Sequence, residues 1–129
     1  MRVLVVDDEP EIRDVLSEYL GSLGYDIHSV GTGREAVEAV AAAMDHFEIA
    51  VVDWHLPGIT GRDVLEGVAA HSPDTRVLVI TGHVAERVSR AHLAGLIGRV
   101  CHKPFSLRTL RAELDALLGM RSPADAPIA

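Results

Sequence analysis

Four short runs of apolar residues are spaced along the chain, at positions 3–6, 49–52, 77–80 and, more weakly, 100–101. The runs are rich in β-branched residues and do not alternate with polar ones, which is typical of parallel strands covered on both faces. Residues 25–30 mix apolar and polar positions and predict a half-exposed strand. The pattern therefore predicts five strands.

Apolar residues between these runs recur at helical spacing. A stripe after Pro10 predicts a first helix ending near Gly21 or Gly24, and its buried side would hold Ile12, Val15, Leu16, Tyr19 and Leu20. Thr32 and Glu35 have the spacing of a capping box, which predicts the start of a second helix. The apolar positions expected to be buried in that helix are Val37, Val40, Ala41 and Met44.

Three more helices are expected further along the chain. Thr60 with Asp63 predicts the start of the third, and Ser106 can cap the fifth. The apolar positions that indicate these helices are Val84, Val88 and Ala91 for a weaker fourth helix, and Leu107, Leu110, Leu114, Leu117 and Leu118 for a fifth that stops at Gly119. Residues 1–119 are then one domain, and residues 120–129 are expected to be a disordered tail or the start of a linker.

Five strands, each followed by a helix, predict an α/β fold with a parallel sheet, right-handed crossovers and helices on both faces. A closed (β/α)₈ barrel would need about 250 residues, whereas this chain has 129. The length therefore favours an open, doubly wound sheet. In such sheets, ligands bind beyond the carboxyl ends of the strands.

Composition narrows the class of protein. No apolar run approaches the ~18 residues of a membrane-spanning helix, and acidic residues follow the first run at once, so a cytoplasmic protein without membrane contact is expected. The single cysteine, Cys101, excludes an internal disulfide and is expected to be a small buried residue. The formal net charge of −7 disfavours direct binding of nucleic acid, which depends on clustered Lys and Arg.

Polar residues of chemical interest follow the apolar runs. The residues at these strand ends are Asp7-Asp8, Asp53, Thr81 and Lys103-Pro104. Three carboxylates brought together repel each other unless a cation neutralises them, and oxygen ligands suit Mg²⁺. One oxygen of Asp53 would remain free to attack phosphorus, while Lys103 and Thr81 would contact phosphoryl oxygens. The pattern predicts a phosphoryl-accepting site.

The motifs VLVVDDEP, VVDWHLPGITG, VLVITGH and CHKPF resemble those of receiver domains of two-component response regulators, of which the chemotaxis regulators are one type. The resemblance implies a flavodoxin-like (βα)₅ fold with strand order 2-1-3-4-5. It also implies that Asp8, Asp53 and the His55 backbone carbonyl bind Mg²⁺ directly, and that Asp7 acts mainly through water. Lys103-Pro104 would be a cis peptide bond.

The resemblance further implies a stoichiometric phosphoacceptor rather than an enzyme. A sensor histidine kinase or a histidine phosphotransfer protein would supply the phosphoryl group to Asp53. Phosphorylation would then act on a downstream target or effector domain, and a phosphorylation-dependent homodimer is compatible with this family. The aromatic switch residue of the family is missing, because Val100 occupies its position. Output through the face of the fourth helix, fifth strand and fifth helix is still expected.

Three alternatives are weighed against this hypothesis. A magnesium phosphohydrolase would usually have an acid where His55 lies, together with a substrate-capping insert. A nucleotide or flavin binder would need a glycine-rich phosphate loop, whereas residues 7–10 are acidic. The remaining alternative is a receiver-like interaction scaffold without phosphorylation, which the intact set of chemical positions disfavours.

Overall fold

The computed structural model describes residues 1–82 and 95–119. The expected fourth helix and the segment 120–129 lie outside the described residues. The strands are β1 (Arg2–Val6), β2 (Asp26–Val30), β3 (Ile49–Asp53), β4 (Arg76–Thr81) and β5 (Arg99–His102). The helices are α1 (Pro10–Ser22), α2 (Gly33–Ala42), α3 (Gly61–His71) and α5 (Leu107–Leu118).

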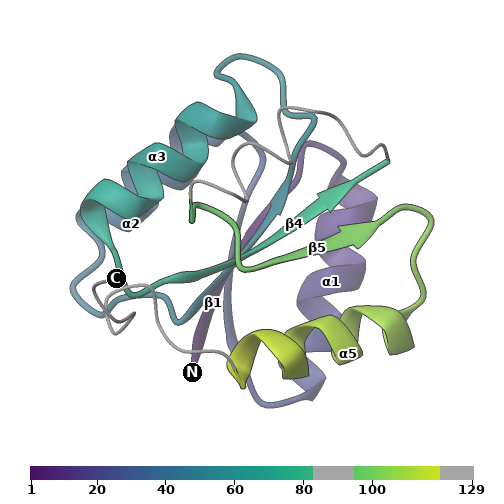
Figure 1. Cartoon of the computed structure of the whole chain (residues 1–129). Helices are drawn as coiled ribbons and strands as arrows, with labels where there is room; N and C mark the ends of the chain where they lie inside the picture. The colour runs from purple at the N-terminus through teal and green to yellow at the C-terminus, as the bar shows by residue number, and fades with distance from the viewer. Residues whose placement is uncertain (83–94, 120–129) are drawn as a thin grey trace.

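The five strands form one parallel sheet in the order β2-β1-β3-β4-β5, which confirms the predicted fold and strand order. Helices α2 and α3 lie on one side of this sheet, and α1 and α5 lie on the other (Figure 1). No helix among residues 1–82 and 95–119 is long and apolar enough to cross a membrane.

Each face of the sheet carries its own hydrophobic core. In β1, Leu4 and Val6 belong to one core with residues of α2 and α3, whereas Val3 and Val5 belong to the other with residues of α1 and α5. All four side chains are buried. Both faces of the central strands are thus covered, which explains why their apolar runs do not alternate with polar residues.

Some positions expected to be buried are exposed. Helix α2 ends at Ala42 and the backbone turns extended at Ala43, so Met44 leaves the helical phase and is fully exposed. Ala41 is also exposed, whereas Ala36, which was not among the expected positions, is buried. Val15 is 51% exposed at the edge of the α1 stripe, and Leu107 is exposed in the first turn of α5.

The three predicted N-caps are present. The hydroxyl oxygens of Thr32, Thr60 and Ser106 each accept a hydrogen bond from the backbone N–H three residues further on, at 3.1 Å. The Thr32 capping box differs from the usual one in a single contact. The Glu35 carboxylate accepts from the Thr32 hydroxyl, at 3.0 Å, and not from the Thr32 backbone N–H. Helix α1 has no side-chain cap and instead begins with proline at its first position.

We expect Thr60→Ala to lower the free energy of unfolding by about 1 kcal/mol. The variant loses the acceptor for the Asp63 N–H at the start of α3, whereas Thr60→Ser keeps a hydroxyl there and should stay close to wild type. Urea unfolding followed by circular dichroism measures both values. Equal destabilisation by the two substitutions would show that the methyl group, and not the cap, matters.

Close packing holds the loop after β3 against α3. A Cβ atom on Gly61 would lie 2.8 Å from Cε3 of Trp54, so the first residue of α3 sits directly on the indole ring. Trp54 is buried and follows Asp53, the last residue of β3. The absence of a side chain at position 61 therefore lets α3 approach the strand end that carries Asp53.

Candidate functional site

The carboxyl ends of the strands bring the expected site residues together. Asp7 follows β1, Asp53 ends β3, Thr81 ends β4, and Lys103 follows β5. Carboxylate oxygens of Asp7, Asp8 and Asp53 all lie within 4.8 Å of one another. Asp7 and Asp53 are 1% and 2% exposed, whereas Asp8 is exposed to solvent. The cluster therefore has two buried carboxylates and one at the surface.

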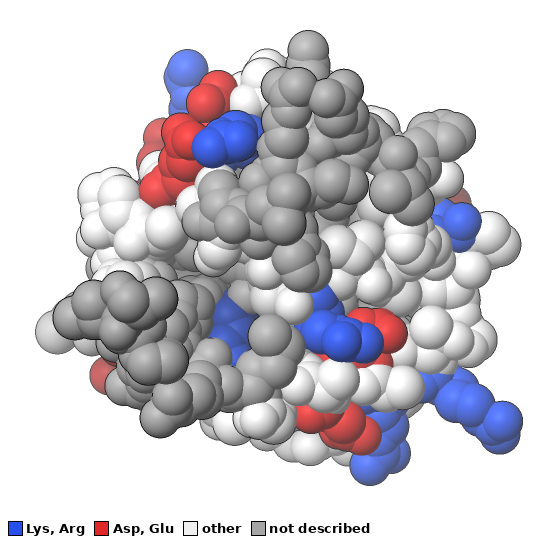
Figure 2. All heavy atoms as spheres, in the orientation of Figure 1, with Lys and Arg blue, Asp and Glu red and all other residues white. Residues whose placement is uncertain are grey.

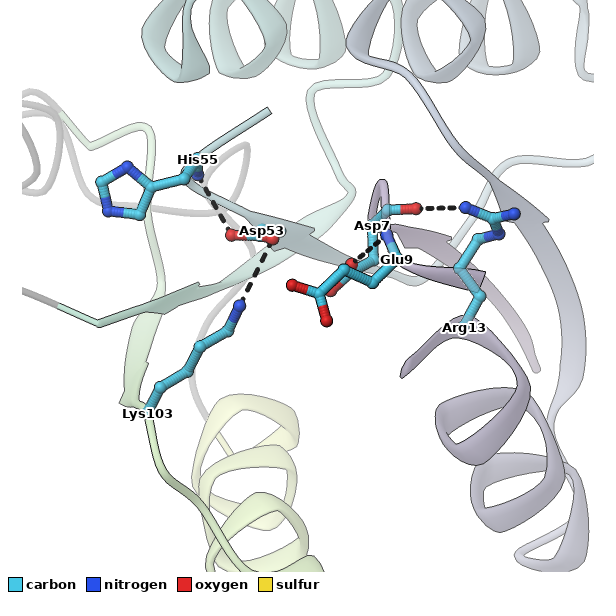
Figure 3. A network of polar contacts seen from close by, with 6 residues as sticks. All are labelled: Asp7, Glu9, Arg13, Asp53, His55 and Lys103. Atoms are coloured by element: carbon cyan, nitrogen blue, oxygen red, sulfur yellow. Dashed lines mark hydrogen bonds and ion pairs between the residues drawn. The ribbon is translucent and has the colours of Figure 1, made fainter. Parts of the chain in front are cut away.

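Both oxygens of the Asp53 carboxylate have a partner. The His55 N–H donates to Oδ1 at 3.0 Å, and the Lys103 ammonium lies 3.4 Å from Oδ2 (Figure 3). The expectation that bound Mg²⁺ leaves one Asp53 oxygen free concerns the metal-bound site and stays a prediction. A carboxylate oxygen can accept more than one hydrogen bond, so both oxygens keep capacity for a further ligand.

Lys103 is held by its main chain as well as by its charge. Its N–H donates to the Thr81 carbonyl at 2.8 Å, which continues the β4–β5 ladder by one bond. The Lys103-Pro104 bond is cis, as the resemblance implied. The side chain of Thr81 is fully buried at the end of β4. The two residues thus lie at adjacent strand ends, beside Asp53.

His55 contributes through its backbone. Its N–H holds Asp53, while its imidazole is exposed and points away from the Asp53 carboxylate in Figure 3. Val100, in the position of the missing aromatic residue, is half-buried and packs against the core on the α2 and α3 side of the sheet.

One carboxylate oxygen of Asp7 accepts a hydrogen bond and the other does not. Oδ1 accepts the Glu9 N–H at 2.8 Å, whereas Oδ2 is buried and has no hydrogen bond. Burial raises the pKa of Asp7 above its ordinary value, and the charges of Asp53 and Asp8 raise it further, while Glu9 N–H and Lys103 oppose the shift. A buried acceptor beside two other carboxylates fits a hard cation with oxygen ligands.

Sequence reasoning missed Arg13, whose guanidinium Nη1 donates to the Asp7 carbonyl at 2.7 Å. Arg13 lies on the second turn of α1 and is half-buried. Its position in the sequence could have indicated that it lies near the acidic cluster, because it comes six residues after Asp7 on the helix that starts beside the acidic pair. The acceptor, however, is a backbone carbonyl, which every residue has.

We expect Asp7→Asn to stabilise the metal-free protein at neutral pH, because a neutral amide replaces a buried carboxylate whose pKa is raised by burial. A raised pKa in the folded state means that the contribution of Asp7 to stability is full at low pH and is lost as pH rises through the folded value. The gain from the substitution should therefore shrink as pH falls toward about 4.

Urea unfolding with a chelator at several pH values measures this difference. Adding Mg²⁺ should reverse the order of stability, because the variant has lost a carboxylate that favours cation binding. A variant less stable than wild type at neutral pH without metal would contradict the assignment of Asp7 as a destabilised carboxylate.

Known proteins share both the sequence pattern and the fold. The family model described as response regulator receiver domain matches residues 3–115. The transcriptional regulatory protein TcrA of Mycobacterium tuberculosis is 36% identical over 98% of this chain and 49% of its own length. The chain thus spans about half the length of this relative.

Solved structures agree with this match. A CheY-like receiver domain protein from Methanospirillum hungatei has a TM-score of 0.81 and 25% identity, covering 88% of this chain and 90% of its own. TrrA from Thermotoga maritima, in complex with Mg²⁺-BeF, has a TM-score of 0.76 and 27% identity, covering 90% and 97%. The chain therefore belongs to the response regulator receiver domain family of two-component systems.

Proposed function

We propose that this domain accepts a phosphoryl group on Asp53 in a reaction that requires Mg²⁺. The observation that carries the proposal is the grouping of Asp7, Asp8 and Asp53 within 4.8 Å, with the Lys103 ammonium 3.4 Å from Asp53. A buried carboxylate that touches a cationic side chain beside two further acids is suited to phosphoryl transfer, which depends mainly on positioning and charge.

In the proposed reaction, an Asp53 oxygen attacks phosphorus and forms a new P–O bond. The P–N bond to the donor histidine breaks, and its electron pair stays on the imidazole. The Lys103 ammonium would attract the phosphoryl oxygens, and the Thr81 hydroxyl would donate to one of them. The protein would promote its own phosphorylation and dephosphorylation. Each molecule would accept one phosphoryl group, so the protein would be a stoichiometric acceptor and not an enzyme.

We infer that Asp8, Asp53 and the His55 carbonyl would bind Mg²⁺ directly and that Asp7 would act mainly through water. Bound magnesium would neutralise the carboxylates and the phosphoryl oxygens. The oxygen donor set and the unpartnered Oδ2 of Asp7 support this assignment. The Mg²⁺-BeF complex of TrrA supports it by analogy.

The proposed partners are proteins. A sensor histidine kinase or a histidine phosphotransfer protein would donate the phosphoryl group, and output would reach a downstream target, an effector domain or a second copy through the face of β5 and α5. The name of TcrA suggests an output in transcription, carried by a part of a longer protein. A cytoplasmic location would suit such partners.

Direct binding of nucleic acid by this domain is not proposed. On the face shown in Figure 2, basic and acidic side chains are interspersed in small groups among other residues. The net charge is −7, and phosphate-backbone binding needs clustered positive charge.

The test is intact-mass spectrometry after incubation with acetyl phosphate. We expect the mass of one phosphoryl group to be added with Mg²⁺ and no addition with a chelator. Peptide mapping should place the group on Asp53. Absence of any adduct, with beryllofluoride also failing to bind, would favour the interaction scaffold, and a group on another residue would refute the assignment of Asp53.

A further inference from the structure

Arg13 connects the second turn of α1 to the main chain of the acidic cluster. Its Nη1 donates to the Asp7 carbonyl at 2.7 Å, and Figure 3 shows the guanidinium on the side of Asp7 away from Asp53 and Lys103. The side chain therefore contacts the backbone of a cluster residue without entering the space between the carboxylates.

Asp7 is fixed at every polar group except one. Its N–H donates to the Val30 carbonyl at 3.2 Å, its carbonyl accepts from Arg13, and its Oδ1 accepts the Glu9 N–H at 2.8 Å. Only Oδ2 is buried without a hydrogen bond, and the other two carboxylates of the cluster lie nearby. The contacts together determine where Oδ2 lies, and Arg13 supplies the one from α1.

Gly31, the first residue after β2, leaves room for this guanidinium. A Cβ atom at position 31 would lie 3.0 Å from Nη1 of Arg13 and 3.5 Å from Cζ. Gly31 does not have a positive φ angle, so its backbone conformation is open to other residues. The space beside Arg13, and not the main-chain conformation, is what a side chain here would disturb.

We propose that Arg13 is a positioning residue for the cation site, and that Gly31 sets the place of its guanidinium. The inference rests on the proposed Mg²⁺ site, in which Asp7 acts mainly through water beside the directly binding Asp8 and Asp53. By holding the Asp7 carbonyl, Arg13 fixes the turn between β1 and α1 and hence the direction in which Oδ2 faces. Residues that orient metal ligands in this way affect metal affinity without touching the ion.

If Arg13 acted only through its charge, its removal would change the Mg²⁺ affinity in the opposite direction. A guanidinium near the cluster repels Mg²⁺, so removing the positive charge alone would strengthen cation binding. Removing a positioning contact weakens binding, because the carboxylate must then be ordered when the cation binds. The direction of the change in Mg²⁺ affinity therefore separates the two roles.

The first experiment is a Mg²⁺ titration of the full chain, followed by the fluorescence of Trp54, the single tryptophan. We expect Arg13→Gln to bind Mg²⁺ about 10-fold more weakly than wild type. Unchanged or tighter binding would overturn the positioning role of Arg13. A wild-type protein that binds no Mg²⁺ would instead refute the proposed function, and this inference with it.

Gly31→Ala provides a second variant that leaves Arg13 in the sequence. We expect weaker Mg²⁺ binding because the added methyl group displaces the guanidinium, and unchanged affinity would overturn the role given to Gly31. Gly21→Ala is the matched control, since a Cβ there meets no atom within 4 Å. Thr60→Ala controls for lost stability, and equal weakening in this variant would show that affinity follows stability alone, which would also overturn the proposal.

Discussion

Asp53→Asn should take up no phosphoryl group from acetyl phosphate under conditions that load the wild-type protein. The substitution keeps the size and planarity of the side chain but replaces the nucleophilic carboxylate by an amide. The His55 N–H can still donate to the amide oxygen in the place of Oδ1, so we expect the fold to be unchanged. Intact-mass spectrometry over time measures the loss.

Asp63→Asn is the matched control for this prediction. Asp63 is exposed in the first turn of α3, where its backbone N–H and not its carboxylate makes the capping bond. The control should therefore load like the wild-type protein. Continued single loading of Asp53→Asn would show that a different residue accepts the phosphoryl group, and the proposed reaction would be wrong.

The sheet could be predicted from the sequence because its signal is local and repeated. In β3, every residue from Ile49 to Asp53 is buried, and an unbroken apolar run is the direct result of cover on both faces. Even the weak run at Val100-Cys101 marked a strand, which extends in the structure to Arg99–His102. The convergence of the carboxyl groups followed from the fold, since parallel strands end at one edge.

Other features could not be predicted because their cause lies in the backbone or in distant contacts. Met44 fits a helical period, but the helix has ended before it. Phe47 is buried outside any strand, where its carbonyl accepts the Thr75 hydroxyl at 2.6 Å and Arg2 lies over its ring. No periodicity marks such a residue. Arg13 was missed because a backbone acceptor carries no sequence signal.

Lys103 is the only lysine among the twelve Lys and Arg residues of the chain. Other basic positions, such as Arg62 on the surface of α3 and Arg99 beside Glu113, have arginine. A lysine ammonium is a compact charge, whereas a guanidinium is a planar fork of donors. The single exception to the use of arginine is therefore the residue that contacts Asp53.

Lys103→Met is expected to slow phosphoryl uptake from acetyl phosphate by about 100-fold, the usual cost of removing one fixed group that stabilises developing charge. Methionine has a similar length and no charge, so the variant loses the ammonium 3.4 Å from Asp53 Oδ2. The time course of the phosphorylated mass gives the rate. Lys103→Arg should take up phosphoryl groups at a rate between those of wild type and Lys103→Met, because arginine keeps the positive charge but spreads it over a planar group.

A Mg²⁺ titration decides how this loss of rate is to be interpreted. Lys103 lowers the pKa of Asp7, against the effects of burial and of the neighbouring acids. Without this cation the carboxylates repel each other more strongly, which favours binding of another cation in its place. Mg²⁺ affinity in Lys103→Met should thus be at least that of wild type, while the rate falls. If affinity and rate fell together, Lys103 would serve to hold the acidic cluster in place, and the charge that assists transfer would have to come from elsewhere.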